Sequence, residues 1–380
     1  MKNISYIWKM KDHYPAKTDG YTVFSCFSGG GGSTMGYKLA GYDVLGCNEI
    51  DKKSIHCYIK NHNPKYVFDE PIQDFKRNPN IPDELFNLDV LDGSPPCTTF
   101  SLAGNREKDW GKKRKYNEGN YDQIIDTLFF DFIDLAERLQ PKIIITENVQ
   151  GLLFGNAKKY VHKIYSEFKD AGYYTTHHLL DASTMGVPQK RMRVFFFSIR
   201  KDLIHFIPKS GFLNTPKLKL SFKEAPIKFK EIYENVIIKD KKHLELTELY
   251  QKYWKQSKQG EHVGKHVNCK KMAMNRVPFA QTTGNYFHPI EMRKLGSEEY
   301  RIMSSFPQDY DFCNLSMENI RHITGMSVPP IMMYKIADNV KKQWIEKINY
   351  KERFNADSQQ NTTSKRTRKR KKRTRKQKSN

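Results

Sequence analysis

The position of one cysteine, Cys97, is explained more easily by a chemical role than by a role in packing. Cys97 directly follows the prolines Pro95 and Pro96, after a short apolar run, in LDVLDGSPPCTTFS. The prolines fix two φ angles and so stiffen the support of the thiol. Thiolates form where a cysteine is partly exposed near positive charge, and a basic stretch runs from Arg106 to Lys115. We interpret Cys97 as a nucleophile, against the alternative of an inert loop cysteine, which we assign to the other five.

Polar side chains also mark the ends of two further apolar runs. Glu147 and Asn148 close the isoleucine-rich run in KIIITENVQG. A carboxylate there can bind an amidine-like edge or transfer a proton. In QKRMRVFFFSIR, three polar residues lie at the mouth of another strand: Gln189, Arg191 and Arg193. Both arginines share one strand face and can donate to a base carbonyl or to phosphate. Each group alone could be a strand cap, but together with Cys97 they predict one site.

A glycine-rich turn follows the first predicted strand, in VFSCFSGGGGSTMGYKLAGYDVLGCNEID. Gly29 to Gly32 let the backbone turn sharply and approach a ligand, and Ser33 can cap the next helix. Glu49 ends the next strand about twenty residues later, where a carboxylate can accept hydrogen bonds from ribose hydroxyls. This order favours a nucleoside-bearing cofactor, either a dinucleotide or S-adenosylmethionine, over a plain tight turn. No Walker lysine follows the glycines.

The elements that must position these residues alternate along the first 200 residues. Apolar runs predict six strands: Tyr21–Phe27, Tyr42–Glu49, Leu88–Asp92, Lys142–Thr146, Tyr173–Leu180 and Arg193–Ile199. Amphipathic segments predict four helices: Ser33–Ala40, Lys52–Asn61, Tyr121–Leu139 and Ala157–Ala171. Several runs are apolar on both faces, as a covered parallel sheet requires. Strand and helix alternation of this kind predicts an open α/β sheet.

Changes in composition and in apolar periodicity along the sequence predict five segments. They are an N-terminal extension (1–19), a catalytic and cofactor-binding domain (20–201), a basic domain with no clear period (202–289), a helical return to the first domain (290–350) and a disordered basic tail (351–380). The return includes a helix after Val-Pro-Pro, in MSVPPIMMYKIADNVKKQWIEKI.

Charge and cysteine usage limit the class of protein. The net charge is +23, and just under half lies in residues 351–380, which hold 13 Lys/Arg against 2 Asp/Glu. A basic body and tail fit a polyanion, most simply nucleic acid, although lysines also serve solubility. No pair of cysteines has CxxC spacing, so we expect no metal site. We see neither a signal peptide nor a membrane span. We expect an intracellular monomer with reduced thiols, in the cytoplasm or nucleoid of a bacterium or phage host; the tail makes the nucleus an alternative.

Taken together, these motifs resemble the DNA (cytosine-5)-methyltransferase family over about residues 20 to 345. FSGGGG is similar to its cofactor loop, NEID to its ribose motif and GSPPCTTFS to its nucleophile loop. TLFFDF resembles the helix that follows that loop, and ENV and QKRMR resemble the acid and arginine motifs. IEMRKLGSEEYRIMSSFPQDY resembles the late motif that supports the recognition domain, and ITGMSVPP the last cofactor motif. The Pro-Cys, ENV and QxRxR set is specific to the family, whereas the glycine loop alone is not.

The resemblance implies a fold, a cofactor and a substrate. The fold would be the Rossmann-like, open, mostly parallel sheet of S-adenosylmethionine-dependent methyltransferases, with a smaller target-recognition domain at 202–289. The cofactor would be S-adenosyl-L-methionine and the substrate double-stranded DNA, whose target cytosine leaves the stack. Methyl transfer to carbon 5 would proceed through a covalent cysteine adduct at carbon 6. The recognised site, and a role in restriction-modification, a virus or a chromosome, stay open.

The resemblance also implies residue roles. Cys97 would be the nucleophile, Glu147 would bind the ring nitrogen and amine, and Arg193 the carbonyl oxygen, with Arg191 and Asn148 completing the catalytic set. The implied cofactor contacts are Phe27, Ser28, Gly29, Gly31, Gly32, Glu49, Ile50, Ile72, Pro95, Leu128, Ser327 and Val328. The implied nucleic-acid contacts are Ser101, Arg106, Gln189 and Arg293.

Three positions depart from the family pattern, all on the cofactor side. Ser25-Cys26-Phe27 stands where many members have Asp-Leu-Phe, and Pro71-Ile72 where they have Asp-Ile. Gly325-Met326-Ser327-Val328 replaces Gly-Asn-Ser-Val. The chemical residues are intact.

Three other functions compete with this interpretation. The same chemistry on tRNA is the nearest, although the Cys-Phe-Thr signature of those relatives is absent from the recognition region. A catalytically silent DNA-binding protein on the same fold would not need Cys97, Glu147 and Arg193. A nicotinamide-dependent oxidoreductase would use only the glycine loop and leaves the other motifs unexplained.

Overall fold

The computed structural model describes residues 4–96, 114–115, 122–123, 127–207, 209–210, 215–238, 241–264, 269–282 and 284–351. Cys97, Ser101 and Arg106, with the tail beyond residue 351, lie outside these ranges. The chain divides into two compact units. The first contains residues 1–201 and 220–338, and the second contains residues 202–219 and 339–380. The five-segment division expected from the sequence stays a prediction.

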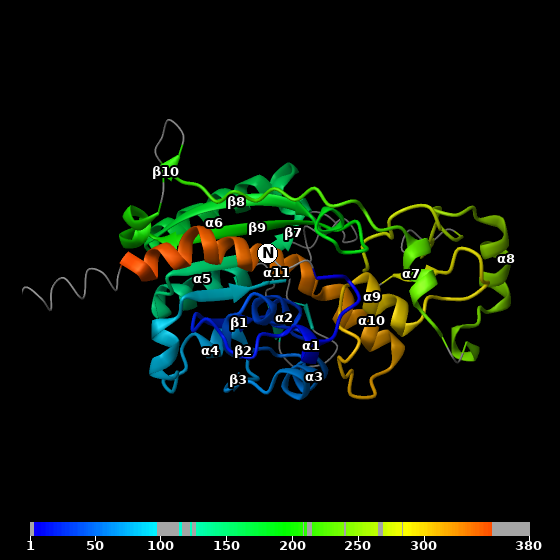
Figure 1. Cartoon of the computed structure of the whole chain (residues 1–380), viewed down its shortest axis with the longest axis horizontal. Helices are drawn as coiled ribbons and strands as arrows, with labels where there is room; N and C mark the ends of the chain where they lie inside the picture. The colour runs from blue at the N-terminus through cyan, green and yellow to red at the C-terminus, as the bar shows by residue number, and fades with distance from the viewer. Residues whose placement is uncertain are drawn as a thin grey trace, which may run out of the picture. The chain divides into compact units, whose positions relative to one another are not determined.

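A seven-stranded sheet forms the centre of the first unit (Figure 1). Its order is β3 (Tyr66–Phe68), β2 (Asp43–Asn48), β1 (Thr22–Cys26), β4 (Val90–Gly93), β7 (Ile143–Val149), β9 (Met192–Arg200) and β8 (Tyr173–Asp181). The first five strands pair in parallel. β9 is antiparallel to both of its neighbours. The predicted open, mostly parallel sheet is therefore confirmed, and the six predicted strands all form.

Two sequence interpretations need correction. β3 was not predicted, because it has only three residues and none of them is buried. The helix predicted over Tyr121–Leu139 begins only at Leu128, and Asp122–Gln123 instead forms β6, paired antiparallel with β5 (Arg114–Lys115). The apolar period before residue 128 was thus read as helical where a short strand lies.

Amphipathic helices connect and cover the strands. They are α2 (Gly32–Leu39), α3 (Lys52–His62), α4 (Ile72–Phe75), α5 (Leu128–Leu139) and α6 (Lys158–Asp170). Parallel neighbours require such crossovers. Phe129 and Phe132 of α5 are buried in the same core cluster as Phe24, Ile144 and Phe196 of the sheet. Burial of each large side chain in this core contributes about 1.5–3 kcal/mol.

The predicted basic domain contains short elements that its sequence did not reveal. α7 (Phe229–Asn235), α8 (Glu248–Gln256) and the parallel pair β12 (Cys269–Lys271) and β13 (Asn285–Phe287) form there. α9 (Ser297–Met303) and α10 (Met317–Met326) follow. Figure 1 shows α7 to α10 together, with α8 farthest from the large sheet. Two small apolar clusters stabilise this region, one around Met272 and Tyr300 and the other around Val263 and Phe287.

The return helix forms as predicted. α11 (Pro330–Val340) begins at the second proline of Val-Pro-Pro and continues into a π-helical turn at Lys341–Ile345. In the second unit, Lys219 and Gln343 exchange two hydrogen bonds of 2.9 and 3.0 Å, and β10 (Lys209–Ser210) pairs with β11 (Thr215–Pro216).

The N-terminal segment is held by hydrogen bonds to residues 305–309, almost 300 positions later in the sequence. Trp8 is 2% exposed, and its Nε1 donates to the carbonyl of Ser305 at 2.8 Å. The Gln308 amide donates to the Trp8 carbonyl, also at 2.8 Å. The Asp309 carboxylate accepts from the amides of Met10 and Lys11, at the start of α1 (Met10–His13). This segment is therefore part of the folded first unit.

We predict that Trp8→Ala lowers the free energy of unfolding by about 3–5 kcal/mol, because it removes a buried indole and leaves the Ser305 carbonyl unpaired. Urea denaturation followed by circular dichroism measures the loss. Lys11→Ala, which shortens an exposed side chain of the same segment, should change stability by less than about 0.5 kcal/mol. Equal effects of the two substitutions would contradict the anchoring role of Trp8.

Candidate active site

Three strand ends meet at one edge of the sheet. β4 and β7 run parallel, so their carboxyl ends lie side by side, with Gly93 opposite Thr146. β9 runs the other way, so its amino end reaches the same edge, with Arg193 opposite Val149. Ligands of open α/β sheets bind outside the carboxyl ends of parallel strands. The acid and arginine motifs therefore share one edge, and β4 leads toward Cys97 there.

Glu147 and Arg193 form an ion pair at this edge. Arg193 Nε lies 2.8 Å from Glu147 Oε1, and the two side chains are 17% and 11% exposed. Arg193 also donates through Nη1 to the Met192 carbonyl at 2.9 Å. Burial lowers the pKa of Arg193, whereas the adjacent Glu147 carboxylate raises it. The pair presents an acceptor and a donor together in a water-poor place, as recognition of a polar ring requires.

Asn148 ties this edge to the segment that carries the predicted nucleophile. Its Nδ2 donates to the carbonyl of Pro95 at 3.2 Å, and its Oδ1 accepts from the Val149 amide at 2.8 Å. Asn148 and Pro95 are both buried. The second residue before Cys97 is thus held against β7. Asn148 acts on the site through the backbone of that segment.

Arg191 and Gln189 lie in the interior. Arg191 is 1% exposed and donates through Nη1 to the carbonyls of Gly325, at 2.8 Å, and Gln281, at 3.2 Å. Gln189 Nε2 donates to the Met303 carbonyl at 3.1 Å, and its Oε1 accepts from the Gln281 amide at 3.0 Å. Burial lowers the pKa of Arg191 to about 9, which keeps the guanidinium charged at neutral pH. These bonds join the segment just before β9 to the loop at Gln281, to α9 and to α10.

The structure places Gln189, expected as a DNA contact, in the interior. Gln189 is fully buried, and its amide oxygen and nitrogen are engaged with protein partners. A group in that position orders the backbone around it. Gln281 is buried as well, with Nε2 donating to the Arg321 carbonyl at 3.0 Å.

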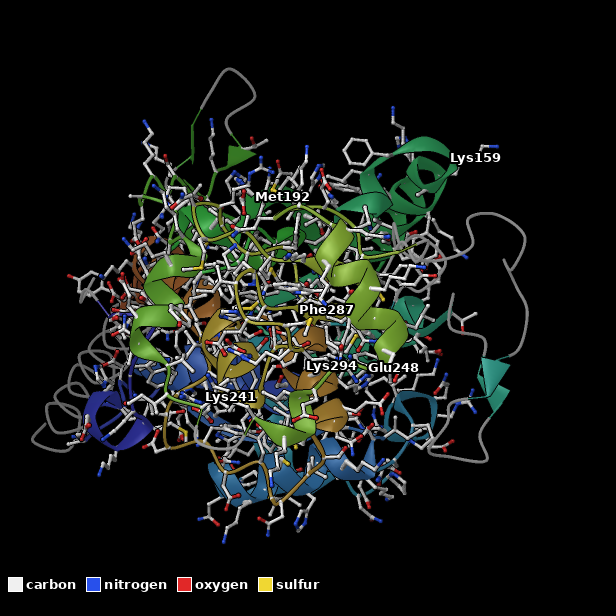
Figure 2. All side chains as sticks on the ribbon, turned by 90° about the vertical axis from the view of Figure 1, so that its right-hand side faces the viewer. Lys159, Met192, Lys241, Glu248, Phe287 and Lys294 are labelled. Atoms are coloured by element: carbon white, nitrogen blue, oxygen red, sulfur yellow. The ribbon has the colours of Figure 1, made fainter. Side chains whose placement is uncertain are left out.

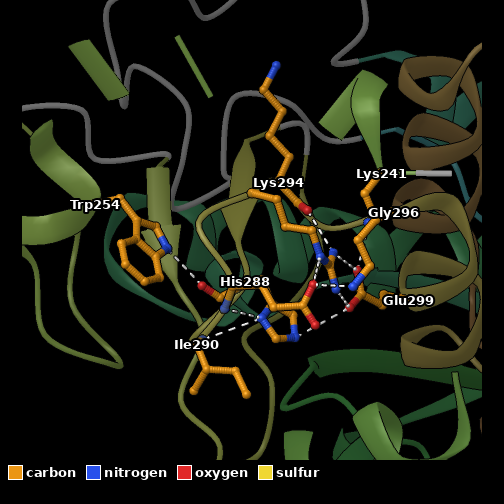
Figure 3. A network of polar contacts seen from close by, with 9 residues as sticks. Lys241, Trp254, His288, Ile290, Lys294, Gly296 and Glu299 are labelled. Carbon is orange, nitrogen blue, oxygen red and sulfur yellow. Dashed lines mark hydrogen bonds and ion pairs between the residues drawn. The ribbon is translucent and has the colours of Figure 1, made fainter. Parts of the chain in front are cut away.

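Arg293 also differs from its expected role as a DNA contact. Its guanidinium makes two 2.8 Å bonds to the carboxylate of Glu299 and a third to Glu291. Lys241 pairs with the same Glu291 at 2.7 Å. Trp254 donates to the His288 carbonyl at 2.8 Å (Figure 3). Arg293 is 5% exposed. It therefore supports the fold of this region, and the sequence motif identified the residue but not its partners.

The glycine turn has a backbone that only glycine allows. Gly31 caps α2 with a φ of 84°. A Cβ on Gly32 would lie 2.2 Å from the Val328 carbonyl oxygen and 2.8 Å from the Ser327 Cβ. The first and last motifs predicted for the cofactor, far apart in sequence, are thus in contact. Close backbone approach rather than turning alone requires glycine at position 32.

Glu49 is positioned beside this turn by two amides. Its Oε2 accepts from Gly29 at 2.7 Å and its Oε1 from Asp51 at 2.8 Å. The side chain is half-buried, and burial raises its pKa, with both amides acting in the opposite sense. Each carboxylate oxygen keeps a further acceptor position. A pair of neighbouring hydroxyls, as on a ribose, is the donor set that matches it.

The other predicted cofactor residues fall into two groups. Phe27 (φ 52°), Ser28 and Ile50 line the ends of β1 and β2 next to the turn, and Ser28 is buried while the other two are half-buried. Ile72 and Leu128 are each 2% exposed and belong to the main apolar core. The structure therefore brings Phe27, Ser28, Ile50 and Glu49 together beside the glycine turn. Ile72 and Leu128 instead pack inside the main apolar core.

Comparison with known proteins agrees with this geometry. Residues 21–342 match the sequence model of the family described as C-5 cytosine-specific DNA methylase. The chain belongs to this family. Type II methyltransferase M.FnuDI of Fusobacterium nucleatum is 27% identical over 353 residues, covering 86% of this chain and 95% of the relative. Type II methyltransferase M.NgoPII of Neisseria gonorrhoeae is 26% identical over 363 residues, covering 88% and 99%.

Solved structures share the fold of this methyltransferase. A prophage-encoded DNA modification methyltransferase from E. coli superimposes with a TM-score of 0.62 at 21% identity, covering 85% of this chain and 99% of that one. DNMT2 of Spodoptera frugiperda gives 0.60 at 17% identity, covering 84% and 99%. The family match shows a cytosine-5 DNA methyltransferase, and it favours DNA over RNA among the functions considered above.

One buried acid of this methyltransferase was not expected from the sequence. Asp92 was predicted as the last residue of the strand Leu88–Asp92, but its burial was not predicted; it lies within β4 and is 4% exposed. The available signal was an acidic residue inside an otherwise apolar run, LDVLDG. Tyr37, which donates to Asp92 from α2, carried no distinguishing signal.

Among the described residues no group of three or more His, Cys, Asp or Glu side chains could hold a metal ion. No helix in the described part of the chain has both the length and the apolar character to cross a membrane.

We predict that Asn148→Asp lowers kcat of the methyltransferase about 10- to 100-fold, because an acidic oxygen replaces the donor to the Pro95 carbonyl and the nucleophile segment moves. The Val149 amide keeps its acceptor, so the fold should persist. Single-turnover methylation with tritiated donor measures the step. Asn87→Asp, an exposed site, is the matched control. Unchanged kcat in Asn148→Asp would show that the Pro95 contact does not position the nucleophile.

Proposed function

We propose that this methyltransferase moves a methyl group from S-adenosyl-L-methionine to carbon 5 of a cytosine flipped out of double-stranded DNA, with Cys97 as covalent nucleophile. One observation carries the proposal. The Glu147–Arg193 ion pair and the Asn148–Pro95 hydrogen bond lie at the same sheet edge, and Cys97 follows Pro95 two positions later in the sequence. An acid and an arginine at the edge to which the Pro-Cys motif is tied by Pro95 support addition of the thiol to a polarised ring.

The chain's residues divide the chemistry among them. The Cys97 thiolate adds to carbon 6 of cytosine, and the displaced electron pair makes carbon 5 nucleophilic. Glu147 hydrogen-bonds ring nitrogen 3 and the exocyclic amine, while Arg193 donates to the carbonyl oxygen. After methylation, carbon 5 loses its proton to a base, and the returning electrons expel the Cys97 thiolate and restore the ring. S-adenosylmethionine, when bound, supplies the methyl group as a sulfonium.

Arg191 and Asn148 act as positioning residues in this proposal. Arg191 fixes β9 to the carbonyls of Gln281 and Gly325, so it sets where Arg193 lies two residues later. Asn148 fixes the Pro95 backbone. Both side chains are buried, so neither needs to touch the base.

The glycine turn, Phe27 and Glu49 fit the proposed cofactor. Glu49 would accept from the two ribose hydroxyls through the free acceptor positions left by its amide partners. Phe27, half-buried with its ring 6.4 Å from that of Phe132, offers an apolar face beside the turn. Ser327 and Val328 close the turn from the other side.

We predict that Glu49→Gln weakens S-adenosylmethionine binding about tenfold, because the amide has one acceptor oxygen where the carboxylate has two. Isothermal titration calorimetry of the purified protein measures the dissociation constant. Asp69→Asn, at an exposed carboxylate near the same strands, should leave it unchanged. The same affinity in Glu49→Gln as in the wild type would remove Glu49 from the proposed cofactor contacts.

The region of α7 and α8 would grip the DNA. Exposed lysines of this region are Lys241, Lys242, Lys252, Lys255 and Lys258. Figure 2 looks onto this end of the molecule, where Lys241 and Lys294 are labelled. Lysines bind phosphates independently of sequence and offset the few kcal/mol that unstacking costs. Type II relatives support a modification role beside a restriction enzyme. Ser101, Arg106 and the basic tail would add further contacts.

We predict that Cys97→Ser abolishes cytosine methylation but leaves DNA binding within about twofold, because serine is a far weaker nucleophile of similar size. Bisulfite sequencing of DNA from expressing cells reads activity and target site together. Cys313→Ser, a half-buried cysteine, should retain activity. Wild-type methylation of tRNA instead of DNA, or full activity in Cys97→Ser, would overturn the proposal.

A further inference from the structure

Asp92 lies in β4, the strand that precedes the Cys97 segment, next to the strand β1 that precedes the glycine turn. It is the third residue of β4 and is 4% exposed. In the sheet it pairs with Ser25 of β1 on one side and with Ile145 of β7 on the other. Cys97 follows it five positions later in the sequence. The reaction described above gives this carboxylate no task.

Two hydroxyl groups from opposite sides of the glycine turn converge on Asp92. Ser25 Oγ donates to Oδ2 at 2.7 Å, and Tyr37 OH donates to Oδ1 at 3.2 Å. Ser25 precedes the turn on β1, and Tyr37 follows it on α2. The carboxylate therefore links the residues before and after the turn, and each of its oxygens accepts one of these hydrogen bonds. The Ser33 side chain, in the first turn of α2, also stabilises the ionised form.

Burying an ionised carboxylate without a cation costs free energy that a purely structural hydrogen-bonding group would not require. Within the described residues, Asp92 forms no ion pair with a lysine, arginine or histidine. The titratable side chains that face it are Cys26 on β1, Tyr37 on α2, Tyr58 on α3 and Glu147 on β7. None of them is a cation. Burial, and secondarily the Glu147 charge, raise the pKa of Asp92 to about 7, against the opposing hydroxyls. An asparagine would satisfy hydrogen bonds here without a desolvated charge.

We infer that Asp92 is a positioning residue that holds the glycine turn in register with β4, so that the bound methyl donor and the Pro-Cys segment are placed together. The inference rests on the proposed function, because it assigns the turn to the donor and Cys97 to the attack. The ionised carboxylate accepts from Ser25 and Tyr37 at once. The protonated carboxyl group carries a hydrogen on one oxygen and accepts less well there, so one of the two hydrogen bonds from Ser25 and Tyr37 becomes weaker.

The same ionisation gives the fold a pH dependence of known sign. The pKa of Asp92 is higher in the folded protein than its ordinary value of 3.8, so folding takes up a proton between these values. The contribution of Asp92 to stability is full below pH 4 and is lost as pH rises through about 7. Asp92→Asn cannot ionise and should lack this loss.

We predict that Asp92→Asn binds S-adenosylmethionine about tenfold more weakly at pH 8, while its melting temperature at pH 8 equals or exceeds that of the wild type. Calorimetric titration and thermal melts across pH 5 to 9 measure both. DNA affinity should stay unchanged. A purely structural Asp92 predicts the opposite pattern, with lower stability and unchanged donor affinity in the folded protein.

Two further variants keep the test decisive. Tyr37→Phe removes one donor without changing shape and should weaken donor binding in the same direction. The exchange Ser25→Asp/Asp92→Ser keeps a carboxylate and a hydroxyl on the same paired positions and should recover part of the affinity. Wild-type donor affinity in both Asp92→Asn and Tyr37→Phe would overturn the inference. A wild-type protein that binds no S-adenosylmethionine would instead refute the proposed function.

Discussion

The reversal of one strand governs the site. Because β9 runs antiparallel to β7, its amino end reaches the edge where the parallel strands β4 and β7 finish. An arginine that begins one strand can then pair with a glutamate near the end of another, as Arg193 and Glu147 do at 2.8 Å. The neighbouring Asn148 holds the Pro95 backbone to the same edge. Backbone direction and these two contacts thus bring segments that are far apart in the sequence to one edge of the sheet.

Buried polar side chains transmit this arrangement beyond the sheet. Arg191 joins β9 to Gly325 and Gln281, and Gln189 joins the same strand end to Met303. Each bond replaces solvent for a group that would otherwise be costly to bury. The glycine turn is fixed in the same manner from the other side, where Tyr310 donates to the Gly30 carbonyl at 2.7 Å. The site is therefore built from interior hydrogen bonds as much as from its exposed groups.

The strands of the sheet could be predicted because runs that are apolar on both faces, such as VFFFSI, are typical of strands in a covered sheet. It missed β3, which has no buried residue, and it extended the α5 helix too far upstream. Motif positions were readable, but burial was not. The family resemblance implied nucleic-acid contacts for Gln189 and Arg293, because a sequence motif carries no sign of the protein partners that a residue has. Arg293 is held by Glu299, six residues away, and by Glu291. The roles of Cys97 and the domain boundaries stay predictions.

The anchoring of the N-terminal segment has a consequence for biosynthesis. Trp8 donates its indole hydrogen to Ser305, a residue 297 positions later. On the ribosome, Trp8 therefore emerges long before Ser305 has been translated. At roughly 5–20 residues per second, that interval lasts tens of seconds. The indole cannot make its native hydrogen bond before then, so this segment can dock only after residue 305 has been made.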